Sequence, residues 1–341
     1  MKYITIKDIA RHLSISVSTV SRALGDDKNI RKETKEKVIE AAKRLGYRPN
    51  PVAINLKYGH TNTVGVIVPE MVTPFASRVI NGIQEVLHTK NIKVIIAESG
   101  GDPEKEKENL QLMEGFMVDG IIIICLCSYK RNKEEYARLQ QAGMPMVFYD
   151  RIPYGLEVPQ VIVDDYMKSF FLVESLIRSG RKQIVHIQGP DDIYNSIERV
   201  RGYKDALAKF GIPFDKNNML IKTGMTFEEG KKAADILVER NIPFNAIFAF
   251  TETLAIGAMN RLRELGKKIP EEIAVASFSG TELSNIVYPK LTTVEPPLYQ
   301  MGKKAAELIL EKIKDPASPN HSIVLDAEIK MRASTPRLEV Y

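Results

Sequence analysis

Short apolar segments alternate with amphipathic helical segments over most of the chain, and this alternation constrains the fold more than any other feature. Four segments rich in Val and Ile have the length of strands: 64–68, 93–97, 120–124 and 146–149. Three stretches between them carry apolar residues at helical spacing: 75–88, 103–116 and 133–141. Strands joined through helices run parallel, with helices on both faces of the sheet. The pattern predicts a doubly wound α/β lobe.

A second series of the same kind follows and predicts a second lobe. Its strands are expected at 161–163, 184–187, 220–221, 246–250 and 273–276. Its helices are expected at 167–179, 197–210, 227–239 and 254–265. In open parallel sheets, ligands bind beyond the carboxyl ends of the strands. We therefore expect two lobes with a ligand-binding cleft between them.

The first 60 residues differ from the rest in charge. They contain 13 Lys and Arg against 6 Asp and Glu, a net charge of +7, whereas the whole chain carries +5. The remaining residues therefore carry −2 in total. A basic head on a nearly neutral body indicates that the head alone binds a polyanion, although a solvated charged surface would have the same composition.

Three short helices are predicted within this basic head, at 6–13, 17–24 and 32–45. Thr5 and Ser16 are suitable N-caps for the first two, and Gly46 is a suitable end for the third. A three-residue turn joins the first two helices, an arrangement that fits a DNA major groove. Periodicity alone leaves open a three-helix bundle without a DNA role.

A linker with two prolines follows the third helix. Pro49 and Pro51 precede about one and a half turns of helical sequence that end at Gly59. A helix of this length is not stable alone in water, so it must fold against a partner.

Several strings of the sequence resemble the LacI/GalR family of transcription regulators. In the head they are Thr5–Ala10, Ser18–Leu24 and Leu45–Asn50; in the core they include Val118–Ile122, Tyr149–Arg151, Val163–Asp165, His186–Pro190 and Pro289–Val294. The resemblance implies an all-α helix-turn-helix head on a two-lobed, periplasmic-binding-protein-like core with two doubly wound parallel sheets. The implied domains are a helix-turn-helix domain at 1–49, a hinge helix and linker at 50–61, and an effector-binding core at 62–341. Within the core, the N-lobe would cover about 62–163 and 295–325, and the C-lobe about 164–294 and 326–341.

The resemblance also implies which head residues contact DNA. Those matching Val17, Ser18 and Arg22 would read base edges, and the physics agrees because an arginine can bind guanine through two hydrogen bonds. The others would hold the backbone or belong to the hinge: Thr5, Ser16, Thr19, Ser21, Asn29, Tyr47, Asn50, Ala53, Leu56 and Lys57. Leu56 would wedge into a minor-groove base step, or alternatively would pack on the core as a linker anchor.

By the same resemblance, six residues would line the effector pocket: Phe75, Asp150, Arg151, Arg199, Thr251 and Ser279. Arg199 could instead form a salt bridge across its lobe. Ser279 stands where the family usually has a carboxylate, so the effector should differ from common hexoses, and one with a carboxylate or phosphate becomes more plausible. Gly25 and Arg31 also depart from the family's usual Asn and Ser, which puts a phosphate contact and a helix cap in doubt.

Together these features predict a homodimeric transcription regulator, most simply a repressor, controlled by a small, sugar-like effector and bound to palindromic operator DNA. Alternatives are the same fold with a partner protein as effector, or a solute-binding protein without a DNA role. No cofactor, metal or catalytic site is expected, since the five histidines are scattered and Asp164 and Asp165 should point apart on a strand. We expect a cytoplasmic protein without a membrane segment, in which Cys125 and Cys127 lie at a buried strand end.

Overall fold

The computed structural model describes residues 4–47, 60–125, 131–153 and 155–336. The chain divides into two compact units, Met1–Thr61 and Asn62–Tyr341. They are described separately below as the head and the core.

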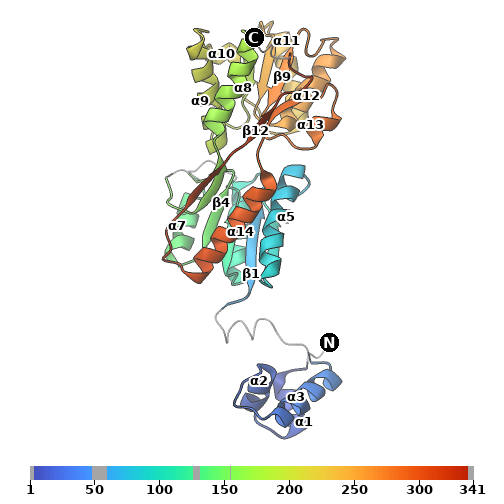
Figure 1. Ribbon diagram of the computed structural model, residues 1–341, viewed down its shortest axis with the longest axis vertical. Coiled ribbons are helices and arrows are strands. Elements are labelled where there is room, and N and C mark those ends of the chain that lie inside the picture. Colours follow the sequence, from blue (N-terminus) through green and yellow to red (C-terminus); the bar gives the residue numbers. More distant parts are fainter. Residues whose placement is uncertain (1–3, 48–59, 126–130, 154, 337–341) are drawn as a thin grey trace. The chain divides into compact units, whose positions relative to one another are not determined.

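The head consists of three helices, shown in blue in Figure 1. They are α1 (Ile6–Leu13), α2 (Val17–Leu24) and α3 (Lys32–Leu45), with the bounds that the sequence predicted. Apolar residues at helical spacing form one small core, made of Ile9, Ala10, Val20, Ala23, Val38, Ala41 and Ala42. Ser14 ends α1 with a left-handed φ of 53°, and the chain then turns so that Ile15 packs against this core.

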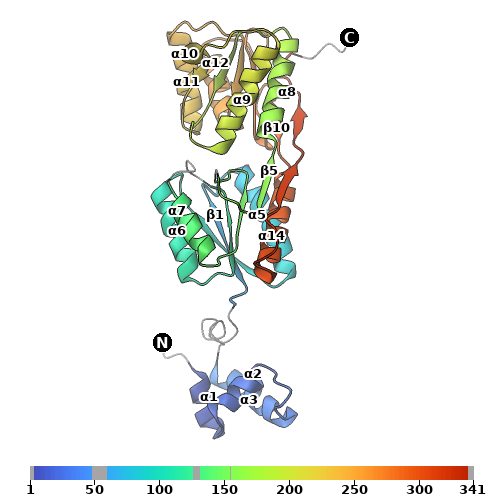
Figure 2. The ribbon, with the colours of Figure 1, turned by 90° about the vertical axis from the view of Figure 1, so that its left-hand side faces the viewer.

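The first lobe of the core is a six-stranded parallel sheet with the order β11-β5-β4-β3-β1-β2. Its strands are β1 (Thr63–Val68), β2 (Lys93–Glu98), β3 (Gly120–Ile123), β4 (Met146–Tyr149), β5 (Gln160–Val163) and β11 (Ser322–Leu325). Helices α5 (Pro74–Thr89) and α14 (Leu298–Lys314) cover one face, and α6 (Pro103–Gly115) and α7 (Lys133–Gln141) cover the other, as Figure 2 shows. Because both faces are covered, β1, β3 and β4 are buried along their whole length.

The second lobe repeats this plan with the strand order β12-β10-β9-β8-β6-β7. Its strands are β6 (Ile184–Ile187), β7 (Leu220–Ile221), β8 (Ala246–Ala249), β9 (Ala274–Ser277), β10 (Thr292–Glu295) and β12 (Glu328–Lys330). Its helices are α8 (Asp165–Arg178), α9 (Tyr194–Lys209), α10 (Lys216–Met219), α11 (Phe227–Glu239), α12 (Glu252–Glu264) and α13 (Leu283–Ile286). Helices α8 and α9 pack together, as do α11 and α12.

Two details differ from the sequence prediction. The segment 161–163, listed with the second series of strands, lies in β5 of the first sheet, where it pairs with β4 and β11; the lobe bounds implied by the resemblance had placed it in that lobe. In addition, β12 pairs antiparallel with β10 at the edge of the second sheet, so that sheet is not wholly parallel. The expectation of a two-lobed α/β core is confirmed.

The chain passes between the lobes three times. It leaves the first sheet after β5 and enters α8, leaves the second sheet after β10 and enters α14, and leaves the first sheet again between β11 and β12. Three connections that run side by side join the lobes while allowing one to rotate against the other.

Close approach of α5 and α14 depends on two glycines. A Cβ atom added to Gly82 would lie 2.2 Å from the carbonyl oxygen of Tyr299, and one added to Gly302 would lie 2.1 Å from that of Val79. Only glycine allows the two backbones to approach so closely.

The described residues contain no helix that is both long enough and apolar enough to cross a bilayer. Cys125 is buried, as its place in the apolar run predicted, and its sulfur accepts a hydrogen bond from the Tyr136 hydroxyl at 3.6 Å. Cys127 lies outside the described residues.

Candidate nucleic-acid interface and ligand pocket

The outer face of α2 presents the residues expected to read bases. Val20 and Ala23 are buried in the head, whereas Val17, Ser18 and Arg22 are exposed. Val17 is 39% exposed, so its apolar side chain is available for contact. The helix therefore offers one apolar contact, one hydroxyl and one guanidinium on its open side.

Hydrogen bonds within the head fix several of the residues expected to hold the DNA backbone. The Ser16 hydroxyl accepts the Thr19 amide at 3.1 Å and so caps α2. Thr5 donates from its amide and its hydroxyl to the Asp8 carboxylate, at 2.9 and 2.7 Å. The Asn29 side chain donates to Asp27 at 3.0 Å. These bonds hold the first turns of α1 and α2 and the loop after α2 in one conformation.

The remaining head residues divide into two groups. Ser21 and Tyr47 are half-buried, and burial raises the pKa of the Tyr47 hydroxyl. Asn50, Ala53, Leu56 and Lys57 lie outside the described residues, so the hinge-helix prediction stays a prediction.

Two family departures have visible consequences. Arg31 occupies the N-cap of α3 and makes no capping hydrogen bond with its side chain. Gly25 ends α2 without a side chain that could reach a phosphate. The missing side-chain cap of α3 is therefore confirmed, and the loss of a phosphate contact at Gly25 stays a prediction.

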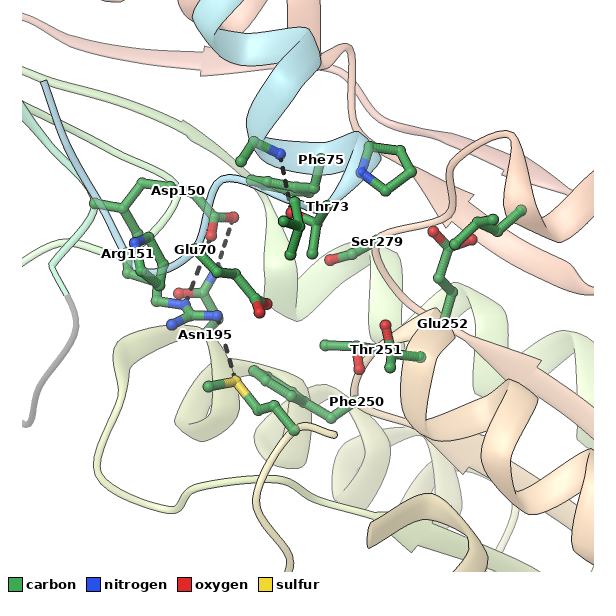
Figure 3. Close-up of a pocket in the computed structure, with 18 of the residues that line it drawn as sticks. Glu70, Thr73, Phe75, Asp150, Arg151, Asn195, Phe250, Thr251, Glu252 and Ser279 are labelled. Atoms are coloured by element: carbon green, nitrogen blue, oxygen red, sulfur yellow. Dashed lines mark hydrogen bonds and ion pairs between the residues drawn. The ribbon is translucent and has the colours of Figure 1, made fainter. Parts of the chain in front are cut away.

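A pocket with a volume of about 220 Å³ lies between the two lobes of the core, and Figure 3 shows its walls. The first lobe contributes the segment after β1, the start of α5 and the end of β4; the second contributes α9 and the loops after β8 and β9. The wall includes all six residues that the sequence assigned to the effector site, and their contact with an effector stays a prediction: Phe75, Asp150, Arg151, Arg199, Thr251 and Ser279.

A polar cluster forms one side of this pocket. Asp150 follows β4, is 6% exposed, and adopts a left-handed φ of 58° that is uncommon outside glycine. Asn195 from α9 donates to Asp150 at 3.3 Å and to Asp165 at 3.1 Å, and thereby joins carboxylates from the two lobes. Figure 3 shows Asp150, Arg151 and Asn195 together on this side.

The sequence left two roles open for Arg199, a contact with the ligand and a salt bridge across its lobe. It is 2% exposed, and its Nε donates to Asp165 at 2.7 Å while its Nη1 donates to the carbonyl of Phe250 at 2.6 Å. The Cζ atom of its guanidinium also lies over the rings of Phe250 and Phe278, 4.5 and 3.8 Å from their respective centroids. The salt bridge is therefore present, and contact with a ligand stays a prediction. Burial raises the pKa of Asp165 to about 7, with Arg199 opposing the shift.

The opposite side carries hydroxyls. The Thr251 hydroxyl caps α12 by accepting the Leu254 amide at 3.4 Å. Ser279 has a left-handed φ of 60°, which an aspartate or asparagine would adopt with less strain than a serine. Next to them Glu252 accepts the Thr281 amide at 2.9 Å and the Ser284 hydroxyl at 2.6 Å, and also bonds the Thr281 hydroxyl.

Sequence reasoning missed Asn195, Asp165, Glu252 and Met225 as parts of this site. Asn195 had a usable signal, because it precedes Arg199 by four residues and so shares its helix face. Asp165 was dismissed as half of an adjacent pair on a strand, but it lies in the first turn of α8 instead. Met225 lies on the loop between β7 and α11, far from Arg151 in the sequence, and no local sequence pattern indicates that it belongs to the pocket.

The head and the core together define a class of protein: a helix-turn-helix module joined to a ligand-binding domain with a pocket between two lobes. In the described part of the chain, no group of three or more His, Cys, Asp or Glu residues could hold a metal ion.

Comparison with known proteins defines the family. Residues 5–50 match the model for bacterial regulatory proteins of the lacI family, and residues 61–334 match that for periplasmic binding proteins and the sugar binding domain of the LacI family. Catabolite control protein A of Priestia megaterium is 32% identical over 97% of this chain and 99% of its own. The transcriptional repressor PurR of Vibrio atlanticus is 32% identical over 98% of this chain and 99% of its own.

A solved structure agrees with these matches. The complex of the transcriptional regulator CelR with cellobiose covers 97% of this chain and 99% of its own, with 26% identity and a TM-score of 0.74. The chain belongs to the LacI family. It is a DNA-binding transcription regulator with an effector-binding core, and not an enzyme.

Proposed function

We propose that the chain is a homodimeric, cytoplasmic repressor whose affinity for palindromic operator DNA is set by a small, sugar-like molecule in the pocket between the lobes. The observation that carries the proposal is that this pocket is built from both lobes, with polar side chains converging from each. A ligand that touches both walls can bind one relative position of the lobes better than another.

Contacts across the cleft supply the physical basis for such a preference. Asn195 of the second lobe donates to Asp150 of the first at 3.3 Å, and the Arg151 guanidinium lies 3.3 Å from the Met225 sulfur. Arg78 on α5 of the first lobe also forms an ion pair with Glu282 of the second. A ligand that replaces or strengthens such contacts changes the free energy of the closed arrangement.

The effector acts through this difference in free energy. We infer that lobe rotation alters the spacing of the two chains that enter the DNA-binding heads of a dimer. A differential of about 1–3 kcal/mol between the two lobe arrangements changes operator affinity about 5- to 150-fold. The CelR complex supports a sugar as the kind of effector, because that relative of known structure is bound to cellobiose.

Dimerisation is supported by apolar side chains on the surface of the core. Leu112, Phe116 and Met117, at the end of α6 and just after it, are 47, 55 and 47% exposed, and in the second lobe Ile286 and Tyr288 are 75 and 78% exposed. Clustered apolar surface of this kind is characteristic of protein interfaces. A second copy of the chain also supplies the second head that a palindromic site requires.

Selection of duplexes from a random library by the full-length protein tests the proposal. We expect enrichment of a palindrome with two equal half-sites, and a matched selection with the Arg22→Ala variant should lose preference at one position of each half-site. Enrichment of no sequence, or of a single unrepeated half-site, would contradict the proposal.

A further inference from the structure

Two polar atoms in the wall of the pocket are buried without a hydrogen-bond partner among the described residues, the Nη1 donor of Arg151 and the Oδ1 acceptor of Asn195, and they indicate what kind of ligand the pocket takes. We infer that the effector is a polyhydroxylated molecule with an anionic oxygen group that Arg151 binds. This inference rests on the proposed function. A hydroxyl next to that group is expected to contact Asn195. An acidic sugar has this combination of groups.

Arg151 is the donor whose capacity is unused. Its side chain is 14% exposed, and its Nη1 atom is buried without a hydrogen-bond partner among the described residues. Its Nη2 atom donates only to the Met225 thioether at 3.3 Å, a weak acceptor. Its Nε forms an ion pair with the Asp150 carboxylate at 3.8 Å, too long for a hydrogen bond. A largely buried guanidinium in this state is stabilised by a ligand that accepts two parallel bonds, as carboxylates and phosphates do.

The nearby carboxylates, by contrast, are already engaged. Glu252 accepts bonds from Thr281 and Ser284, and Asp165 accepts from Arg199 and Asn195. Asp150 accepts one bond from Asn195 and forms an ion pair with Arg151. An anionic group on the ligand would accept both bonds that the Arg151 guanidinium can donate, which a single neutral hydroxyl does not.

The position of Ser279 points in the same direction. It lies on the opposite side of the pocket from Arg151 and brings a hydroxyl where an aspartate would add a negative charge. Besides Asp150 and Glu252, the wall contains the acidic residue Glu70. Its side chain is exposed to solvent, which screens its charge.

Asn195 explains why hydroxyls are needed as well as the anion. This side chain is 1% exposed, and its Oδ1 atom is buried without a hydrogen-bond partner within the described residues. An amide oxygen can only accept, so it calls for a donor such as a ligand hydroxyl. The rings of Phe75 and Phe250 line the pocket as well and can cover the C–H face of a sugar ring.

Calorimetric titration of the full-length protein tests the inference with matched pairs: D-glucuronate and D-gluconate against D-glucose, and D-galacturonate against D-galactose. D-glucose 6-phosphate distinguishes a phosphate from a carboxylate, and inorganic phosphate controls for the anion alone. We expect an acidic or phosphorylated member to bind at least 10-fold more tightly than its neutral counterpart. Tighter binding of a neutral member, or no binding by any anionic member, overturns the inference.

Two variants locate the effect. Arg151→Met removes the donors while keeping much of the volume, and should weaken the anionic ligand about 10- to 100-fold, as expected for loss of hydrogen bonds to a charged group. Ser279→Asp should weaken the anionic ligand and improve binding of its neutral counterpart. Arg138→Met, on the exposed surface of α7, is the matched control and should leave both affinities unchanged. Unchanged binding of the anion by Arg151→Met overturns the inference.

A measurement without ligand guards against a folding defect. Because Arg151 is paired with Asp150, which is almost completely buried, Arg151→Met should unfold at a lower temperature than the wild type, whereas Arg151→Lys keeps a cation beside Asp150 and should unfold close to the wild-type temperature. A lysine cannot donate two parallel hydrogen bonds, so Arg151→Lys should still weaken the anionic ligand; a folded Arg151→Lys variant that binds it as tightly as the wild type overturns the inference. Operator selection tests the proposed function separately: a neutral sugar that releases operator DNA would leave that function standing while the inference fails.

Discussion

The buried ion pair between Arg199 and Asp165 gives a quantitative test of how the second lobe is held together. Both side chains are almost inaccessible to solvent, at 2 and 1% exposure, and the Nε–Oδ1 distance is 2.7 Å. Replacing Arg199 with methionine keeps apolar packing between Phe250 and Phe278 but leaves the Asp165 carboxylate without its cation. Breaking a buried pair in this way costs about 3–5 kcal/mol.

The expected loss depends on pH, because Asp165 can take up a proton. Burial raises the pKa of Asp165 to about 7 even with Arg199 in place, and without Arg199 the carboxyl should be protonated more readily still. A protonated carboxyl needs no cation. We therefore expect Arg199→Met to lower the free energy of unfolding of the core by about 3–5 kcal/mol at pH 8 and by clearly less at pH 5.

Urea unfolding followed by far-ultraviolet circular dichroism measures this, since the chain has no tryptophan to report on it. A double-mutant cycle with Asp165→Asn supplies the control: the double variant should lose less than the sum of the single ones, with a coupling of about 1–3 kcal/mol. A loss below about 1 kcal/mol at pH 8, or additive single effects, would refute the reasoning.

Further predictions concern the head, the core packing and the pH dependence. Ser16→Ala should destabilise the head by about 1 kcal/mol through loss of the α2 cap, seen as faster hydrogen exchange of the α2 amides; unchanged exchange would contradict it. Gly302→Ala should cost about 1–3 kcal/mol in urea unfolding, because its Cβ would meet the Val79 carbonyl; no loss would mean that α5 and α14 are not so close. Since the pKa of Asp165 is raised on folding, its contribution to stability is greatest below about pH 4 and is lost as the pH rises through about 7. Asp165→Asn should therefore flatten that decline in urea titrations between pH 4 and 8, and an unchanged slope would count against it.

Helix periodicity in the sequence was sufficient to predict the head. The apolar spacing of Ile9, Val20 and Val38 places one face of each helix inward, and a small three-helix domain has few other ways to bury them. The strands of the core were also predictable, because runs such as 120–123 are too short and too β-branched for buried helices.

Long-range pairing was not predictable in the same way. The strand pattern alone listed 161–163 with the second series, whereas in the structure it pairs with β4 and with β11, which is about 160 residues away in sequence. The antiparallel direction of β12 depends likewise on where the third passage between the lobes lies. Neither relation leaves a local pattern in the chain.

The candidate pocket, like the fold, could be predicted from the sequence only in part. The six expected residues follow strand ends or lie on helices near the cleft, so a topology argument could place them there. Side-chain partners could not be placed: the choice of Arg199 between ligand and Asp165, and the role of Asn195 between two carboxylates, depend on how α8 and α9 pack.

Reciprocal titration tests most directly whether the pocket and the DNA-binding head are coupled. The operator Kd of the full-length protein is measured with and without saturating effector, and the effector Kd with and without saturating operator. Thermodynamic linkage requires the two ratios to be equal, and we expect both to lie between about 5 and 150. Two ratios of one would show that the pocket and the head act independently, which contradicts control of DNA binding by the pocket.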